Sequence, residues 1–328
     1  MARESLVAVS YPVDDEFTRI NTSVLDGAAR VVFLHGRPED EFREIVRQAN
    51  VLIGWLLGEE LPAGILHDSP RLQFVQLLSA GADAVDFGAI PERLMLASNV
   101  GAYSEPMAEH VVAMALALAK RLPQRHAALA RGEFRMWDPV LTLDGAVCAI
   151  LGLGGIGKAT ARLMRAFGMR IQAVNSTGRT SEPVEFIGTL DDLDQVLAAA
   201  DVLVMALPLI KATRGLIGAR ELGLMKPTAI LVNVSRAAIV DERALYEHLR
   251  DQPEFCAGID TWWHEPAPGS GFSTRYPFLD LPNVIGSPHN SGVVDGALEF
   301  GAGKAAENVR RFLDGEAVIG VVRREDYL

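Results

Sequence analysis

The fold of this chain is decided by residues 149–161, which read Ala-Ile-Leu-Gly-Leu-Gly-Gly-Ile-Gly-Lys-Ala-Thr-Ala. Gly152, Gly154 and Gly157 form a Gly-x-Gly-x-x-Gly pattern where an apolar strand passes into a helix. The first glycine permits a tight turn, the second lets the backbone approach a pyrophosphate, and the third lets helix and strand pack closely. The helix N-terminus adds unpaired N–H groups and the positive end of a dipole. The pattern predicts dinucleotide binding; a glycine-rich turn of a methyltransferase or flavoprotein is the alternative.

Short apolar, β-branched runs alternate with helical stretches on both sides of this motif. Strands of this kind, separated by helices, are typical of parallel sheets that are buried on both faces. We therefore predict an α/β fold with doubly wound parallel sheets. The predicted strands are Leu6–Ser10, Arg30–Leu34, Val51–Trp55, Gln73–Leu78, Leu94–Asn99, Val147–Leu153, Arg170–Asn175, Val202–Leu207, Ile230–Val234, Ala257–Thr261 and Asn283–Ser287.

A long helix from Ser104 separates the two series of strands, because apolar residues recur there at helical spacing. Arg131–Leu143 lacks a clear period, which predicts a loop or arm. A last helix is expected over Asp295–Leu313, followed by an apolar run at Ala317–Val322 that returns to the first domain. The predicted domains are 1–100 plus 293–328 for the first, and 101–292 for the dinucleotide-binding domain.

Composition narrows the class of protein. The 328 residues are 49% apolar and 22% charged, with 31 basic and 42 acidic side chains, so the net charge is −11. An acidic chain without a basic block disfavours nucleic acid and membranes as partners.

Cys148 and Cys256 lie in apolar runs without metal-ligand spacing, so we expect buried thiols and no metal site. Residues 1–12 have no long apolar run and Val111–Ala119 is too short to cross a bilayer, so we expect a cytoplasmic protein.

The end of the second strand of the dinucleotide-binding unit bears on the choice of cofactor. An acid there bonds the adenosine ribose 2′-OH of NAD. Here the turn reads Asn175-Ser176-Thr177-Gly178-Arg179, and no carboxylate occurs before Glu182. Hydroxyl, amide and guanidinium donors suit a 2′-phosphate, which an acid would repel. The turn favours NADP, with NAD as the alternative; a solvated turn that contributes to neither choice is the plainer interpretation.

Charged residues follow three later strands. Arg236 comes just after Ile230–Val234, Asp260 and Glu265 come at the next strand end, and His289 comes after the last strand. Ligands of open α/β sheets bind outside the carboxyl ends of the strands. We therefore expect a cation, a carboxylate and an imidazole to converge at that edge.

These motifs, in this order, resemble the D-isomer-specific 2-hydroxyacid dehydrogenase family. The resemblance runs from the turn Leu78-Ser-Ala-Gly-Ala-Asp83 through Ala108-Glu-His110 to His289. It implies a flavodoxin-like substrate domain and a Rossmann coenzyme domain, with the active site in the cleft between them. It also implies hydride transfer between NAD(P)H and a small 2-oxo acid to give a (D)-2-hydroxy acid. The family resemblance further implies a homodimer, held through the middle domain and an arm like Arg131–Leu143.

The residue roles make physical sense for that reaction. Arg236 can hold the substrate carboxylate and polarise the carbonyl with always-charged donors. His289 can donate a proton to the carbonyl oxygen, since an ordinary histidine pKa of about 6.5 lets it cycle near neutral pH. Glu265 would pair with His289, hold its tautomer and favour its protonated form.

Further contacts are implied by the resemblance. The backbone at Ser79, Ala80 and Gly81 would bind the substrate carboxylate, and Asp260 would bond the nicotinamide carboxamide. Arg236 and His289 would also contact the substrate. The other histidines we expect to be structural, namely His35, His67, His110, His126, His248 and His264. The full set of cofactor contacts implied is Gly152, Gly154, Ile156, Gly157, Asn175, Ser176, Thr177, Arg179, Leu207, Pro208, Thr213, Val234, Ser235, Arg236, Asp260, His289 and Gly292.

Departures from the commonest family pattern bear on the substrate. The formate-oxidising branch carries Gln where Glu265 stands, so formate is disfavoured. Trp55 and Trp137 could line a pocket for a short, uncharged side chain, and with the NADP-type turn this resembles glyoxylate and hydroxypyruvate reductases. Two alternatives stay open: a nucleotide-sensing binding protein like the family's transcriptional corepressors, and a dehydrogenase of an unusual donor such as phosphite.

Overall fold

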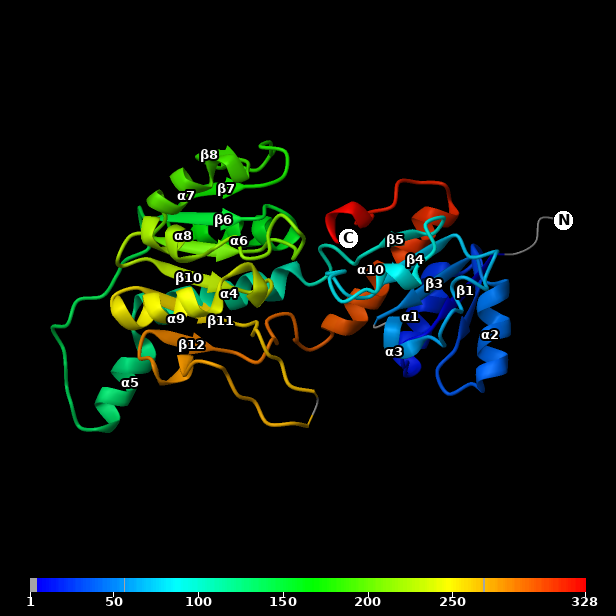
Figure 1. Cartoon of the computed structure of the whole chain (residues 1–328), viewed down its shortest axis with the longest axis horizontal. Coiled ribbons are helices and arrows are strands. Elements are labelled where there is room, and N and C mark those ends of the chain that lie inside the picture. Colours follow the sequence, from blue (N-terminus) through cyan, green and yellow to red (C-terminus); the bar gives the residue numbers. More distant parts are fainter. Residues whose placement is uncertain (1–4, 56, 268) are drawn as a thin grey trace. The chain divides into compact units, whose positions relative to one another are not determined.

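The computed structural model describes residues 5–55, 57–267 and 269–328 (Figure 1). The chain forms two compact units: the residues up to Tyr103 join Val294–Leu328 in the first, and Ser104–Val293 form the second. The expectation about a leader falls partly on residues 1–4, which lie outside the described residues. Across the described ranges, no helix is both long and apolar enough to span a bilayer.

The first unit is built on a five-stranded parallel sheet in the order β2-β1-β3-β4-β5. This is the flavodoxin-like strand order. Side chains alternate across it: Val7 and Val9 pack under α1 and α10, whereas Leu6 and Ala8 face the cluster under α2. The strands are β1 (Ser5–Val9), β2 (Ala29–Phe33), β3 (Val51–Gly54), β4 (Phe74–Leu77) and β5 (Met95–Ala97). The helices are α1 (Asp15–Leu25), α2 (Glu39–Gln48), α3 (Leu57–Glu60), η1 (Phe87–Ala89), α10 (Ala297–Leu313) and η5 (Arg324–Asp326).

The second unit has a seven-stranded parallel sheet in the order β12-β11-β10-β9-β6-β7-β8. Counted from the glycine-motif strand β6, this is the Rossmann order with one added strand. The strands are β6 (Val147–Leu151), β7 (Arg170–Val174), β8 (Phe186–Gly188), β9 (Val202–Met205), β10 (Ile230–Asn233), β11 (Cys256–Ile259) and β12 (Val284–Gly286). The helices are α4 (Ser104–Ala119), α5 (Leu122–Ala130), α6 (Gly155–Ala166), α7 (Leu193–Ala199), α8 (Ala219–Leu224), α9 (Glu242–Asp251), η2 (Leu190–Asp192), η3 (Ala237–Ile239) and η4 (Phe278–Asp280).

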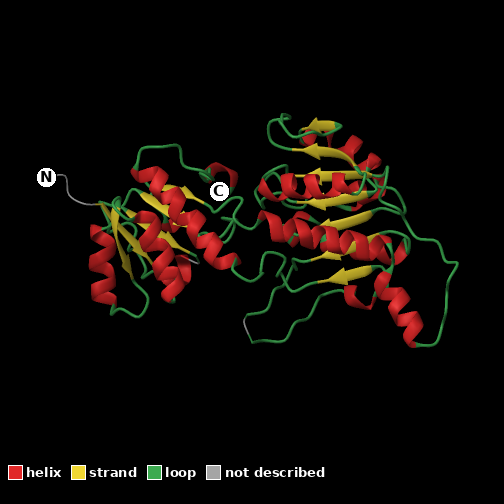
Figure 2. Cartoon of the chain, turned by 180° about the vertical axis from the view of Figure 1, so that it is seen from behind, coloured by secondary structure: helices red, strands yellow, loops and turns green. Residues whose placement is uncertain are grey.

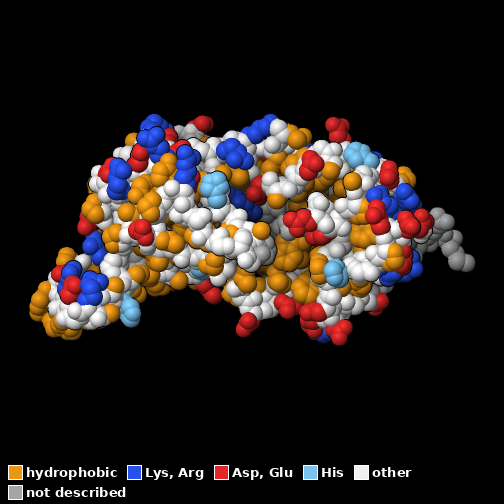
Figure 3. Space-filling view, turned by 60° about the horizontal axis from the view of Figure 1, so that its bottom comes forward, with side chains coloured by type: hydrophobic (Ala, Val, Ile, Leu, Met, Phe, Trp, Pro, Cys, Tyr) orange, Lys and Arg blue, Asp and Glu red, His pale blue; other side chains and the backbone are white. Residues whose placement is uncertain are grey.

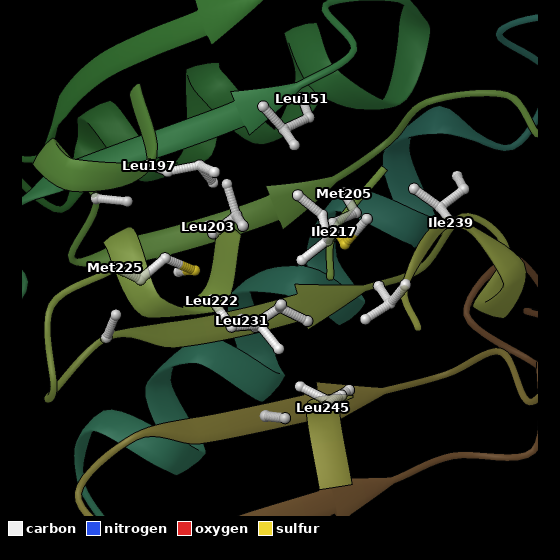
Figure 4. Packing of buried hydrophobic residues seen from close by; sticks show 14 of the residues in the cluster. Leu151, Leu197, Leu203, Met205, Ile217, Leu222, Met225, Leu231, Ile239 and Leu245 are labelled. Carbon is white, nitrogen blue, oxygen red and sulfur yellow. The ribbon is translucent and has the colours of Figure 1, made fainter. Parts of the chain in front are cut away.

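Helices cover both faces of this sheet. Leu151 and Leu203 point to the face that α7, α8 and α9 cover (Figure 4). Their neighbours Ile150 and Val204 pack on the opposite face of the sheet. Helices α4 and α6 cover that face (Figure 2). Burial on both faces explains why these strands read as continuous apolar runs.

The predicted strands are confirmed, with ends that differ by one or two residues. Arg131–Leu143 forms no helix or strand, as expected. The prediction missed β8, because three residues at a sheet edge are too short for a periodic signal. The apolar run Ala317–Val322 is no strand; it adds one isolated antiparallel bridge, between Val321 and Ala97. Cys148 and Cys256 are buried free thiols, and burial raises the pKa of Cys148 to about 12.

Candidate active site

The turn from β6 into α6 requires its glycines for three different reasons. Gly152 has a φ of +96°, and a Cβ there would lie 2.5 Å from the Ala206 carbonyl oxygen. A Cβ on Gly157 would lie 2.0 Å from the Gly152 carbonyl oxygen, so only glycine lets helix and strand approach this closely. Gly154 is exposed, and a Cβ on it would meet nothing within 4 Å. The open backbone at Gly154, before the twelve-residue helix α6, is suited to receive a pyrophosphate.

The turn after β7 is organised by Asn175. Its Oδ1 accepts hydrogen bonds from the backbone N–H groups of Thr177 (3.0 Å) and Gly178 (2.7 Å). Its Nδ2 donates to the Arg179 carbonyl oxygen at 2.8 Å. Asn175 therefore shapes the turn with both ends of its amide. The side chains of Ser176, Thr177 and Arg179 are exposed around it.

The loop after β9 is held in a similar way by Thr213, which is only 2% exposed. Its hydroxyl donates to the Pro208 carbonyl oxygen at 2.6 Å and accepts from the Ile210 N–H at 2.9 Å. Leu207 is half-buried and Pro208 is exposed at the start of this loop. Thr213 shapes the loop that carries these two residues.

Arg236 stands on a turn that Asn233, the last residue of β10, holds together. The Asn233 Oδ1 accepts both the N–H and the hydroxyl of Ser235, each at 3.0 Å. Its Nδ2 donates to the Arg236 carbonyl oxygen at 3.2 Å, and Arg236 Nη1 donates to the Ser235 carbonyl oxygen at 2.8 Å. Val234 and Ser235 are buried, while Arg236 is half-buried. Sequence reasoning gave Asn233 no role, although an Asn at a strand end followed by Ser is a signal for such a turn.

Asp260 follows β11 and anchors the loop that carries His289. Its side chain is fully buried, and its main-chain oxygen accepts the His289 N–H at 2.8 Å. Its Oδ1 accepts from the Ser287 hydroxyl at 2.5 Å and the Asn290 N–H at 3.1 Å. Its Oδ2 accepts from the Ser291 N–H at 3.3 Å. The carboxylate that the resemblance assigns to the nicotinamide thus holds the neighbouring loop as well.

His289 adopts an unusual backbone conformation and pairs with Glu265. Its φ of +50° lies in the left-handed region, which costs a residue with a Cβ on the order of 1 kcal/mol. The ring Nδ1 lies 2.8 Å from Glu265 Oε2, and the Trp262 N–H donates to Oε1 at 3.0 Å. Because an ionised carboxylate only accepts, Nδ1 carries the hydrogen of this bond and Nε2 is left for other partners.

The surroundings of Glu265 favour its ionised form. Burial works against its charge, but the hydrogen bonds from His289 and the Trp262 amide, with the charges of His289 and Arg236, outweigh it. The net result is a pKa of Glu265 below its usual value. Arg236 follows β10, which pairs with the strand β11 that precedes Glu265, and its charge also lowers the pKa of Glu265. The structure thus brings Arg236, Glu265 and His289 together at one edge of one sheet.

Ser79, Ala80 and Gly81 lie in the other unit, in the turn that begins one residue after β4. The Ser79 hydroxyl donates to the Gly81 carbonyl oxygen at 2.8 Å, and the Ser79 carbonyl oxygen accepts the Asn99 N–H at 2.8 Å. The Asn99 side chain donates to the Leu78 carbonyl oxygen at 3.2 Å. Asn99, which sequence reasoning did not single out, therefore shapes this turn.

Comparison with known proteins identifies the same family that the sequence motifs resemble. The family model described as D-isomer specific 2-hydroxyacid dehydrogenase, NAD binding domain, matches residues 112–291. A glyoxylate reductase of Thermococcus gammatolerans is 32% identical over 297 residues, covering 88% of this chain and 87% of the relative. A D-3-phosphoglycerate dehydrogenase of Methanocaldococcus jannaschii is 30% identical over 323 residues, covering 96% of this chain but only 59% of that longer relative.

A solved structure is also similar over the whole chain. It is a D-isomer specific 2-hydroxyacid dehydrogenase from Xanthobacter autotrophicus Py2 in complex with NADPH and MES. The TM-score is 0.80 and the identity 26%, with 99% of this chain and 100% of that chain covered.

The glycine geometry makes a testable distinction between two small substitutions. Gly157→Ala should destabilise the fold by about 2 kcal/mol, since its Cβ would collide with the Gly152 carbonyl oxygen. Gly154→Ala should leave the melting temperature unchanged but weaken binding of the reduced nicotinamide cofactor about tenfold, because its Cβ would occupy open space at the helix N-terminus. Thermal melting and fluorescence titration would separate the two effects. Equal melting temperatures for both variants would contradict the assigned roles.

Proposed function

The chain belongs to the D-isomer specific 2-hydroxyacid dehydrogenase family, and on that premise we propose that it reduces glyoxylate or hydroxypyruvate to the 2-hydroxy acid. It is an NAD(P)-dependent oxidoreductase. The observation that carries the proposal is the pairing of His289 with Glu265 near Arg236 at the carboxyl ends of neighbouring strands. The glyoxylate reductases among its relatives favour this substrate class over a corepressor-like role or an unusual donor.

The proposed chemistry assigns one task to each side chain. The turn of Gly152, Gly154 and Gly157 would hold the pyrophosphate of the nicotinamide cofactor, which would supply the hydride for the carbonyl carbon of the 2-oxo acid. Arg236 holds the substrate carboxylate and stabilises the charge that develops on the carbonyl oxygen. His289 donates a proton to that oxygen from Nε2, because Nδ1 is engaged with Glu265. Glu265 stabilises the protonated imidazole before the transfer.

NADP is the cofactor that the turn after β7 favours. The exposed side chains of Ser176, Thr177 and Arg179 offer donors, and none of them carries negative charge. The first carboxylate beyond the turn, Glu182, lies 3.6 Å from the Lys158 ammonium, which offsets its charge. A 2′-phosphate therefore meets less repulsion here than beside the acid of an NAD-type turn.

The reaction is tested by absorbance at 340 nm with the purified protein. NADPH should be oxidised in the presence of glyoxylate or hydroxypyruvate, and more slowly with a bulky aromatic 2-oxo acid. His289→Asn should lower kcat by about 10²–10⁴-fold, the usual contribution of acid–base catalysis. The matched control His264→Asn alters the exposed histidine beside Glu265 and should retain wild-type turnover. Flat traces with every 2-oxo acid would overturn the proposed substrate class.

Glu265→Gln tests the electrostatic role of the carboxylate. Because the pKa of Glu265 lies below its ordinary value, its charge persists down to acid pH and is lost only as pH falls through that lowered value. In the variant this side chain has no charge to lose, so the decline of the reduction rate on the acid side that follows protonation of Glu265 should be absent. The rate at pH 8 should fall severalfold. A pH profile of kcat/KM that coincides with the wild-type profile would exclude this role.

Arg179→Ala tests the cofactor assignment. Loss of charge-assisted hydrogen bonds to a phosphate is worth about 1.5–3 kcal/mol, so the NADPH-to-NADH ratio of kcat/KM should fall about 10–100-fold. Arg170→Ala, at the opposite end of the same strand β7, is the matched control and should leave the ratio unchanged. If the NADPH-to-NADH ratio of kcat/KM is unchanged in Arg179→Ala, then Arg179 does not determine the cofactor preference.

A homodimer is the proposed assembly. Helix α5 and the arm Arg131–Leu143 carry hydrophobic side chains that are exposed in the single chain, with Phe134 75%, Met136 61% and Trp137 88% exposed. Figure 3 shows hydrophobic side chains along the rim of the lobe that these segments form. Large hydrophobic side chains that are exposed together in this way are typical of an interaction surface. The resemblance assigns this surface to the second copy of the chain.

The assembly is tested by light scattering on a sizing column. The wild-type protein should elute with the mass of a dimer, and the double substitution Phe134→Ser with Trp137→Ser should shift it toward the monomer. Ile319→Ser, which alters an exposed apolar residue of the first unit, is the control and should stay dimeric. A monomeric wild-type protein would refute the proposed assembly.

A further inference from the structure

A chain of polar side chains crosses the second unit beneath the catalytic loop. His110, in the second turn of α4, places Nε2 2.9 Å from the hydroxyl oxygen of Ser287. The same hydroxyl lies 2.5 Å from Asp260 Oδ1. His110 Nε2 and Asp260 Oδ1 are themselves 3.9 Å apart. The three residues come from α4, the segment after β12 and the end of β11, so only the fold brings them together.

The direction of these hydrogen bonds follows from the donor inventory. The carboxylate of Asp260 can only accept, so the single hydroxyl hydrogen of Ser287 goes to Asp260. The Ser287 oxygen must then accept from its other neighbour. His110 Nε2 therefore carries a hydrogen and acts as the donor. This argument assigns the tautomer of His110 and gives its ring a polar function that packing alone does not require.

The chain of hydrogen bonds ends at the backbone of the catalytic loop. The carboxylate of Asp260 accepts the N–H groups of Asn290 and Ser291, and its main-chain oxygen accepts the N–H of His289. Three consecutive amides thus depend on one residue. These amides belong to His289 and the two residues after it. The left-handed backbone of His289 is unfavourable by itself and persists only when surrounding contacts hold it. Rotation of the Asp260 carboxylate would release two of these three amides.

We propose that His110 is a positioning residue for reduction, which acts through Ser287 and Asp260 to hold the backbone of the His289 loop. The inference rests on the proposed function, because His289 matters as the proton donor of that reaction. His110 does not touch the reacting atoms. Its donor fixes the Ser287 hydroxyl, the hydroxyl orients the Asp260 carboxylate, and the carboxylate holds residues 290 and 291.

Kinetics of four variants test the donor rather than the volume of the side chain. His110→Phe removes the donor, whereas His110→Gln can place an amide N–H near the position of Nε2. We expect His110→Phe to lower kcat about tenfold or more with little change in the KM for NADPH, since a small misplacement of a catalytic group has effects of this size. His110→Gln should recover most of the loss. Ser287→Ala should lower kcat about as much as His110→Phe does. The double variant of Ser287→Ala with His110→Phe should have a kcat no lower than that of either single variant.

Hydrogen–deuterium exchange gives a readout that does not depend on activity. In His110→Phe, the amides of residues 289–291 should exchange faster than in the wild-type protein, while the strand amides of β10 and β11 should keep their rates. His67→Phe, which alters an exposed histidine of the first unit, is the control and should change neither kcat nor exchange.

The outcomes separate this inference from the proposed function. If the wild-type protein reduces no 2-oxo acid but the exchange result holds, the reaction assignment fails and the loop-holding network stands. If reduction is found but His110→Phe matches His67→Phe in kcat and exchange, the positioning role is overturned. Two further results would overturn the positioning role. One is an equal loss of kcat in His110→Phe and His110→Gln that parallels lower melting temperatures. The other is a loss of kcat in the double variant that equals the sum of the two single effects.

Discussion

The close approach of α6 to β6 is the constraint on which the second unit depends. Gly157 packs where a Cβ would lie 2.0 Å from the Gly152 carbonyl oxygen. This contact packs α6 against β6 and directs the N-terminus of the helix to the carboxyl edge of the sheet. Parallel pairing of β6 with β7 and β9 then brings every later strand end to that same edge. The glycine turn and the residues proposed for catalysis share one edge for this reason.

Short polar side chains shape the loops at that edge. Asn175, Thr213, Asn233 and Asp260 each bond the backbone of the loop that follows their strand or lies beside it. Each replaces hydrogen bonds that the ladder no longer supplies beyond the strand. Three of them, Asn175, Thr213 and Asp260, are also among the residues expected to contact the cofactor. At this edge the same side chains can therefore shape a loop and belong to the proposed site.

Periodicity and motif spacing were sufficient to predict both doubly wound sheets and the strand ends that carry Arg236, Glu265 and His289. They were insufficient for β8, because a three-residue edge strand has no measurable period. They were also insufficient for the partner of His110, since Ser287 lies far away in sequence and is adjacent only after α4 packs on the sheet. From the sequence alone, His110 could not be distinguished from a histidine that only packs in the core. It was therefore predicted to be structural.

The sequence by itself determined the fold class, the glycine turn and the strand ends after which Arg236, Glu265 and His289 stand, since these depend on local pattern and on spacing along the chain. Only the tertiary structure decided that His289 is left-handed, that Nδ1 faces Glu265, and that Asp260 holds three consecutive loop amides. Those features depend on hydrogen-bond directions between segments remote in sequence. Composition and spacing carry no information on such directions, because donors and acceptors acquire them only when strands and helices pack.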